Sequence, residues 1–154
     1  YTKFSEAFGY TYTDQDGKQQ PVFMGCYGIG TTRVMGVLAE VCHDDDGLTW
    51  PAAVAPARVH IVPIAKSQED KAFQVAEDLC GQLEERGCDY ILDDRLTMSV
   101  GARLADADLI GVPARVVVSP KTLEQGKVEL KDRSTGAVSH LLLNDAVETL
   151  VGDA

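Results

Sequence analysis

The residues of this chain best suited to chemistry lie close together near its start, where Met24 to Arg33 read Met-Gly-Cys-Tyr-Gly-Ile-Gly-Thr-Thr-Arg. Gly28 and Gly30 lack Cβ atoms where an extended segment is expected to enter a helix, so a flat ligand could lie against bare backbone. Arg33 in the first helical turn adds a planar, permanently charged group suited to phosphate oxygens, beside the N–H donors of the helix start. The stretch predicts a nucleotide site, and the alternative is a tight turn with an incidental arginine.

Two common nucleotide motifs and a metal site are not indicated by these residues. A dinucleotide fingerprint needs a third glycine where Arg33 stands, and the Gly-Lys-Ser/Thr of a P-loop is absent. The acidic run Asp44 to Asp46 lacks the remaining ligands of a calcium loop. The four cysteines form no Cys-x-x-Cys pair. We therefore expect no metal and no cofactor held by the chain itself.

The elements that must position this stretch are short ones. Alternation in Tyr10 to Thr13, a turn at Asp16-Gly17 and an extended piece from Pro21 to Met24 predict a β-hairpin. Apolar spacing predicts a helix from Thr31 to Val41. The segment 43–47 is expected to be a polar loop. The two prolines of Trp50 to Pro56 predict a connector between domains.

Beyond the connector, strands and helices alternate in the order β-α-β-α-β-β-β-α, which predicts an α/β domain with a mixed five-stranded sheet flanked by helices. Ser67 is expected to cap the first helix, and Ser99 and Gly111 are expected to bound the second. The predicted strands are 58–64, 88–92, 115–118, 127–131 and 138–143, and the predicted helices are 67–86, 99–109 and one from Asn144.

The charge of the chain limits how it could bind a nucleic acid. A formal net charge of −10 argues against binding by bulk electrostatics, because phosphate contacts need lysine and arginine. Residues 68–94 hold nine acids and two bases, whereas residues 95–133 hold seven bases and five acids. One face could therefore admit RNA, unless the imbalance is only a solvated surface. No apolar run is long enough to span a membrane, so we expect a soluble cytoplasmic protein.

The string Gly-Cys-Tyr-Gly-Ile-Gly-Thr-Thr-Arg resembles motif 3 of the class II aminoacyl-tRNA synthetases, and specifically that of the bacterial-type prolyl-tRNA synthetases. The Trp-Pro connector and residues 57–150 resemble the same family. The resemblance implies that residues 1–50 are an α+β remnant of an antiparallel-sheet catalytic domain, residues 51–56 the connector, and residues 57–154 an anticodon-binding domain.

The resemblance also assigns roles in the catalytic part. Arg33 would be the catalytic arginine that contacts ATP, with Gly28 and Gly30 lining the ATP cleft. Cys26 would lie near bound proline, and its alternative role is that of a small buried hydrophobic residue. ATP with Mg²⁺ would be used by the full-length enzyme, which is expected to be a homodimer.

Anticodon bases are unstacked and recognised at their edges. Carboxylates can accept from guanine N1 and N2, whereas arginine and lysine donate to O6 and N7. Asp106 and Asp108 near the end of one predicted helix, followed by Arg115 and Lys121, offer this mixture. The resemblance places the guanine-reading acid at Asp106 and its basic partners at Arg115 and Lys121, and the alternative is that these are ordinary surface charges.

The implied function is ATP-dependent attachment of proline to tRNA(Pro), with tRNA(Pro), proline and ATP as partners and neither DNA nor a membrane. Motifs 1 and 2 of the class are not found in these residues, so the chain alone is expected to be inactive. The alternative is a non-catalytic, tRNA-binding accessory paralogue of a class II synthetase.

Overall fold

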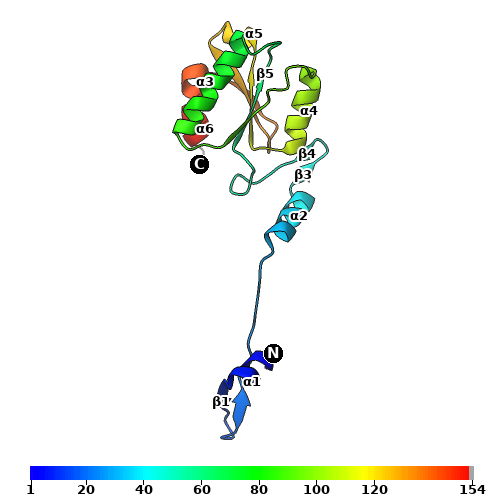
Figure 1. Ribbon diagram of the computed structural model, residues 1–154, viewed down its shortest axis with the longest axis vertical. Helices are drawn as coiled ribbons and strands as arrows, with labels where there is room; N and C mark the ends of the chain where they lie inside the picture. The colour runs from blue at the N-terminus through cyan, green and yellow to red at the C-terminus, as the bar shows by residue number, and fades with distance from the viewer. Residues whose placement is uncertain (153–154) are drawn as a thin grey trace. The chain divides into compact units, whose positions relative to one another are not determined.

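The computed structural model describes residues 1–152 (Figure 1). The chain forms two compact units, Tyr1–Met35 and Gly36–Ala154.

Unit 1 contains one helical turn and a hairpin. Helix α1 (Lys3–Phe8) precedes strands β1 (Thr11–Thr13) and β2 (Gln19–Pro21), which pair antiparallel. The Asp14 carboxylate accepts hydrogen bonds from the backbone of Asp16 and Lys18 and so shapes the turn. The predicted hairpin is confirmed, although its second strand begins two residues earlier than expected. Helix α1 was not predicted.

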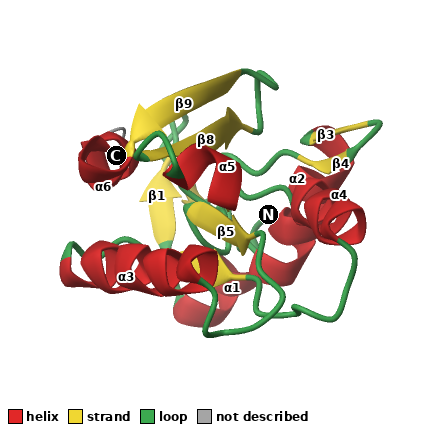
Figure 2. Ribbon diagram, turned by 90° about the horizontal axis from the view of Figure 1, so that it is seen from above, coloured by secondary structure: helices red, strands yellow, loops and turns green. Residues whose placement is uncertain are grey.

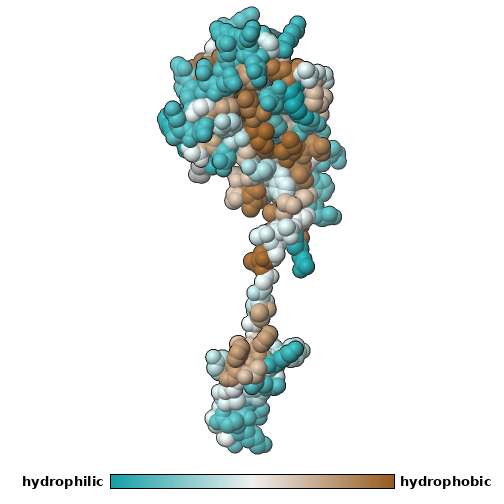
Figure 3. Space-filling view, viewed as in Figure 1, coloured by the Kyte–Doolittle hydropathy of each residue, from teal (hydrophilic) through white to brown (hydrophobic). Residues whose placement is uncertain are grey.

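Unit 1 buries little of its own apolar surface. Ser5 is buried within α1, whereas aromatic side chains are exposed, and the space-filling view shows hydrophobic patches on this unit (Figure 3). The exposed aromatic residues of unit 1 are Tyr1, Phe4, Phe8, Tyr10, Tyr12, Phe23 and Tyr27. Burial of apolar area is the main favourable term in folding, so this unit has few means of stabilising itself.

Helix α2 (Thr31–Val41) has the bounds predicted from its apolar spacing. None of its described residues is buried. It leads into a small hairpin of β3 (His43–Asp44) and β4 (Gly47–Leu48), where the sequence predicted only a polar loop. The loop prediction is wrong because the Asp44 carboxylate accepts from the backbone of Asp46 and Gly47 and thereby closes a tight turn.

A five-stranded sheet in the order β6-β5-β7-β8-β9 forms the centre of unit 2. Strands β5, β6 and β7 are parallel, and β8 and β9 add antiparallel. Helices α3 and α6 cover one face and α4 lies on the other (Figures 1 and 2). The predicted mixed sheet flanked by helices is confirmed. The bounds are β5 Val59–Pro63, α3 Lys71–Glu85, β6 Tyr90–Leu92, α4 Val100–Ile110, β7 Ala114–Val118, α5 Pro120–Leu123, β8 Lys127–Asp132, β9 Val138–Leu142 and α6 Leu143–Gly152.

Alternate residues of the central strands build the core. Val59 and Ile61 of β5 and Val116 of β7 are fully buried against α3 and α6. Their neighbours in the strands face α4, because successive side chains of a strand point to opposite faces. The core on the α3 side also contains Leu79, Leu83, Val118, Val128, Ala146 and Leu150. The opposite face is left to carry a different, more polar set of side chains.

The ends of the helices partly follow the sequence. Ser99 Oγ accepts from the Ala102 amide and Gly111 ends α4 in the left-handed conformation, as predicted. The predicted Ser67 cap is wrong, since α3 begins at Lys71. The Asp70 carboxylate accepts from the backbone of Lys66 and Ser67 and so holds the residues before the helix in a turn. Helix α5 begins with a capping box of Ser119 and Thr122, and it was not predicted.

Candidate functional site

The glycine-rich segment before α2 is exposed in unit 1. Residues 22–30 have no regular secondary structure, and a Cβ atom at Gly28 would meet nothing within 4 Å. Arg33 lies in the first turn of α2 and is exposed, and its side chain makes no hydrogen bond or ion pair with any residue from 1 to 152. Cys26 is also exposed, so its interpretation as a small buried residue does not hold here. The nucleotide site remains a prediction for these residues.

A row of basic side chains crosses the sheet on the face that carries α4. His60 of β5 is aligned with Arg115 of β7, and Arg115 is aligned with Lys131 of β8. Aligned residues on neighbouring strands project from the same face of a sheet. His60 and Arg115 are buried, and Lys131 is half-buried. Three nitrogen-bearing side chains therefore lie next to one another under α4.

Asp108, near the end of α4, forms ion pairs with two members of this row, Arg115 and Lys131. Its Oδ2 atom lies 2.7 Å from Arg115 Nη1 and 3.0 Å from Lys131 Nζ. The side chains of Asp108 and Arg115 are 17% and 11% exposed. Two polar atoms of the pair, Asp108 Oδ1 and Arg115 Nε, are buried and have no hydrogen-bond partner. Buried polar groups are nearly always satisfied, so this unpartnered acceptor and donor, like the buried His60 Nδ1 and Arg103 Nε nearby, mark the face under α4 as a candidate site.

Asp106 belongs to a separate cluster. Arg95 Nη1 lies 2.7 Å from Asp106 Oδ2, and Arg95 also makes two hydrogen bonds to the buried Asp93. Burial acts to raise the pKa of Asp93, but the hydrogen bonds from Arg95 outweigh it and hold that pKa below its ordinary value. Hydrogen bonds to Asp93 and then to Asp106 raise the pKa of Arg95.

Lys121 lies apart from both clusters. It is an exposed residue of α5, which follows the carboxyl end of β7, whereas Arg115 is the second residue of that strand. Of the three residues predicted to read an anticodon, the structure therefore brings none into contact with another. It joins Arg115 to Asp108 and Lys131. The sequence offers Asp108, like Asp106, as an acceptor near the end of a predicted helix, but does not single it out as the base-reading acid. No sequence pattern marks Lys131 beyond its place in a predicted strand.

Two further buried groups brace the site. Arg103 is 1% exposed and donates from its guanidinium to the carbonyls of Pro63 and Asp93, which ties α4 to the ends of β5 and β6. Burial lowers the pKa of His60, so its imidazole is neutral near pH 7. The bonds from Arg103 therefore help to hold α4 on the sheet.

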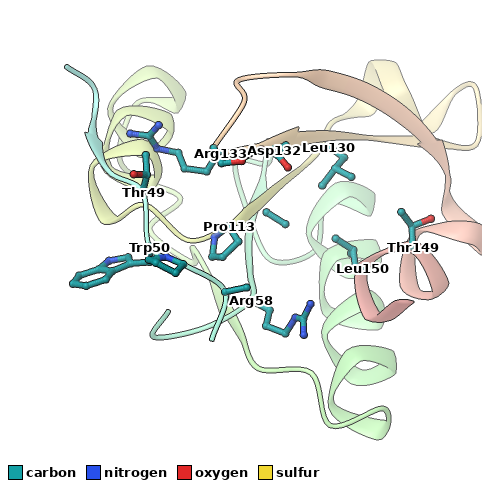
Figure 4. Close-up of a pocket in the computed structure, with 13 residues that line it drawn as sticks. Thr49, Trp50, Arg58, Pro113, Leu130, Asp132, Arg133, Thr149 and Leu150 are labelled. Carbon is teal, nitrogen blue, oxygen red and sulfur yellow. Dashed lines mark hydrogen bonds between the residues drawn. The ribbon is translucent and has the colours of Figure 1, made fainter. Parts of the chain in front are cut away.

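A cavity of about 480 Å³ lies elsewhere in unit 2, between the connector, the ends of β7 and β8, and α6 (Figure 4). Pro113, Leu130 and Leu150 give it a mainly apolar lining. Leu130 is aligned with Val116 of the α3-side core, so this cavity opens on the face opposite to Arg115. No pattern in the sequence predicts this cavity.

Neither a metal centre nor a membrane span is found among residues 1–152. No three or more His, Cys, Asp or Glu side chains there are grouped so that they could hold a metal ion. No helix in this range combines the length and apolar character needed to cross a bilayer.

Sheet order, helix placement and the charged row define unit 2 as an α/β domain with a charged cluster on the face that carries α4. Residues 58–152 match the family described as the anticodon binding domain, and the chain belongs to this family.

Similar proteins extend the match toward the start of the chain. The chain is 44% identical over 148 residues to the proline–tRNA ligase of Bifidobacterium adolescentis, covering 96% of the chain and 24% of that protein. It is 48% identical over 148 residues to that of Leifsonia xyli subsp. xyli, covering 96% and 25%. For Bacillus cytotoxicus the identity is 42% over 152 residues, covering 99% and 26%. The expected resemblance to the prolyl enzymes is confirmed, and the chain spans about a quarter of the length of these relatives.

Proposed function

We propose that this chain is the part of a proline–tRNA ligase that reads the anticodon of tRNA(Pro) and contributes motif 3 to the ATP site. The observation that carries the proposal is the Arg115–Asp108 pair, with an unpartnered donor and an unpartnered acceptor, on a domain of the anticodon binding family. The similarity to proline–tRNA ligases over nearly the whole chain supports the choice of amino acid.

The pair has the chemistry needed for guanine. Proline codons begin with two cytosines, so the matching anticodons contain two guanines. Arg115 can donate to O6 and N7 of a guanine, and Asp108 can accept from its N1 and N2 groups. Each partner would exchange part of its present ion pair for bonds to the base, through the exposed parts of the two side chains, 11% for Arg115 and 17% for Asp108. Asp106 and Lys121 are proposed to contact neighbouring nucleotides.

Recognition of this kind suits an acidic chain. With a net charge of −10, the protein has no large excess of lysine and arginine to neutralise phosphates. Binding must then depend on a few well-placed groups and on base edges. Arg115 and Lys131, whose charges Asp108 partly neutralises, are such well-placed groups.

The remaining roles belong to the full-length enzyme. There the carboxylate of proline would attack the α-phosphate of ATP and pyrophosphate would leave, which gives prolyl-adenylate. A terminal hydroxyl of tRNA(Pro) would then attack the prolyl carbonyl, and AMP would leave. We propose that Arg33 stabilises the charge developing on the phosphates, beside Gly28 and Gly30, with Mg²⁺ held through ATP and Cys26 near proline. The proposed division is 1–50 catalytic, 51–56 connector and 57–154 anticodon-binding, in a homodimer.

Proline-dependent exchange of pyrophosphate into ATP tests this function. The full-length gene product is expected to catalyse the exchange, and Arg33→Ala is expected to slow it by about a hundredfold, the usual effect of removing one group that stabilises transition-state charge. The 154-residue chain alone is expected to give no exchange. Pyrophosphate exchange by the isolated chain would refute the expectation that it needs motifs 1 and 2 for activity. A full-length protein without any exchange would instead favour the accessory paralogue.

A further inference from the structure

The carboxyl end of α4 receives several donors from segments far away in the sequence. Arg133 Nε donates to the Asp108 carbonyl at 3.0 Å, the Trp50 indole donates to the Ile110 carbonyl at 3.0 Å, and the Trp50 amide donates to the Gly111 carbonyl at 3.2 Å. The last carbonyls of a helix have no partner within it. Here they are satisfied from outside, so the end of α4 is held by its surroundings.

Arg133 connects this helix end to the hairpin β3–β4. Its side chain is 4% exposed, and its guanidinium forms two parallel bonds with the Asp44 carboxylate, of 2.5 Å and 2.6 Å, across 89 positions of sequence. The Arg133 side chain, one of those that line the cavity, extends from the end of β8 toward Thr49 (Figure 4). Paired bonds between arginine and a carboxylate fix orientation as well as distance. One side chain therefore joins β8, the hairpin and the backbone of Asp108.

The hairpin fits against α4 without space to spare. A Cβ atom on Gly47 would overlap the Leu109 backbone, and one on Gly111 would overlap the Leu48 carbonyl. Contacts this close between backbones leave no room for sliding. The position of the hairpin and the position of the last turn of α4 are consequently linked.

We propose that the Asp44–Arg133 pair is a positioning device for RNA recognition, which holds the hairpin on the end of α4 and so keeps Asp108 beside Arg115. This inference rests on the proposed function, since it assumes that the Asp108–Arg115 pair reads a base. Neither Asp44 nor Arg133 touches the RNA in this account. Both act through the placement of Asp108, whose own backbone carbonyl is bound by Arg133.

Asp44→Asn is the variant that tests the device. It keeps an oxygen for the hairpin turn but removes the charge from the pair with Arg133. The matched control is Asp45→Asn, which removes the same charge from an exposed neighbour in the same hairpin. With the 154-residue chain and an anticodon stem-loop RNA of tRNA(Pro), we expect about tenfold weaker binding for Asp44→Asn, a typical coupling between linked sites. Asp45→Asn is expected to bind like the unaltered chain.

A double-mutant cycle separates positioning from general stability. If Asp44 acts through Asp108, then Asp44→Asn has little further effect on affinity in an Asp108→Asn background. Hydrogen exchange should also be faster at the Thr49 and Trp50 amides of Asp44→Asn. Additive losses in the cycle, or unchanged affinity for Asp44→Asn, would overturn the inference. Stem-loop binding that is insensitive to Arg115→Ala would instead overturn the proposed function itself.

Discussion

Replacing Arg115 by alanine is expected to remove both affinity and base discrimination. The guanidinium is 11% exposed and lies 2.7 Å from Asp108, so a base that reaches this pair binds in a place with little water. A good two-bond contact between arginine and guanine contributes about 2 kcal/mol, which corresponds to roughly a 30-fold change in the dissociation constant. We expect a loss of this size for the stem-loop of tRNA(Pro).

The effect of the same change on stability is expected to be smaller. Arg115→Ala leaves Asp108 with Lys131 at 3.0 Å, so the carboxylate keeps one charged partner. The loss in unfolding free energy is expected to be about 1.5 kcal/mol, the lower end of the range for a hydrogen bond to a charged group, because Lys131 still pairs with the carboxylate. Arg115→Lys keeps the charge but not the planar pair of donors, and it is expected to bind with intermediate affinity.

Fluorescence anisotropy with a labelled stem-loop at fixed salt measures the binding loss. Arg86→Ala is the control, because Arg86 is an exposed arginine whose partner is Glu148 on α6. It removes the same charge from the α3 side of the sheet. If Arg86→Ala and Arg115→Ala weaken binding equally, the effect is one of net charge and the assignment of Arg115 is refuted.

Two further predictions concern the hairpin and its partner. Gly111→Ala is expected to destabilise the chain by about 2–3 kcal/mol, because a Cβ atom there would overlap Leu48 and because the left-handed backbone disfavours a side chain. Gly87 has the same left-handed backbone but lies in open space, so Gly87→Ala is expected to cost only about 1 kcal/mol. The urea midpoints of the two variants measure both losses. The hydrogen bonds from Arg133 hold the pKa of Asp44 below its ordinary 3.8, so the stability that the pair adds is present above that pH and is lost as the pH falls through the lower folded value. The stability difference between the unaltered chain and Asp44→Asn should therefore narrow on acidification below about pH 4, and a gap that widens there would contradict this sign.

Local signals in the sequence were enough for most elements of unit 2. Ser99 and Gly111 bound α4 as predicted, because a cap and a left-handed glycine act within one turn of the helix. The run Arg115 to Val118 was recognised as an inner strand from its β-branched residues. Helices α1 and α5 were missed because they are only 6 and 4 residues long, too short to show a period.

The site was predicted less completely than the fold. The role of Arg115 in reading the anticodon stays a prediction, and the partner it has in the structure, Asp108, depends on which side of α4 faces the sheet. Asp106 and Asp108 are two positions apart, about 200° around a helix, so only one can lie over Arg115. The sequence alone does not fix that rotation. The pair of Asp44 and Arg133 had no local signal, since its members are 89 positions apart.

The most direct test of the account is a comparison of two stem-loop RNAs that differ only in the two guanines of the proline anticodon. With Arg115 and Asp108 reading a guanine edge, the chain is expected to bind the guanine-containing loop at least about tenfold more tightly than one with adenines in their place. Equal affinity for both loops at physiological salt would contradict the claim that this face of the sheet recognises bases.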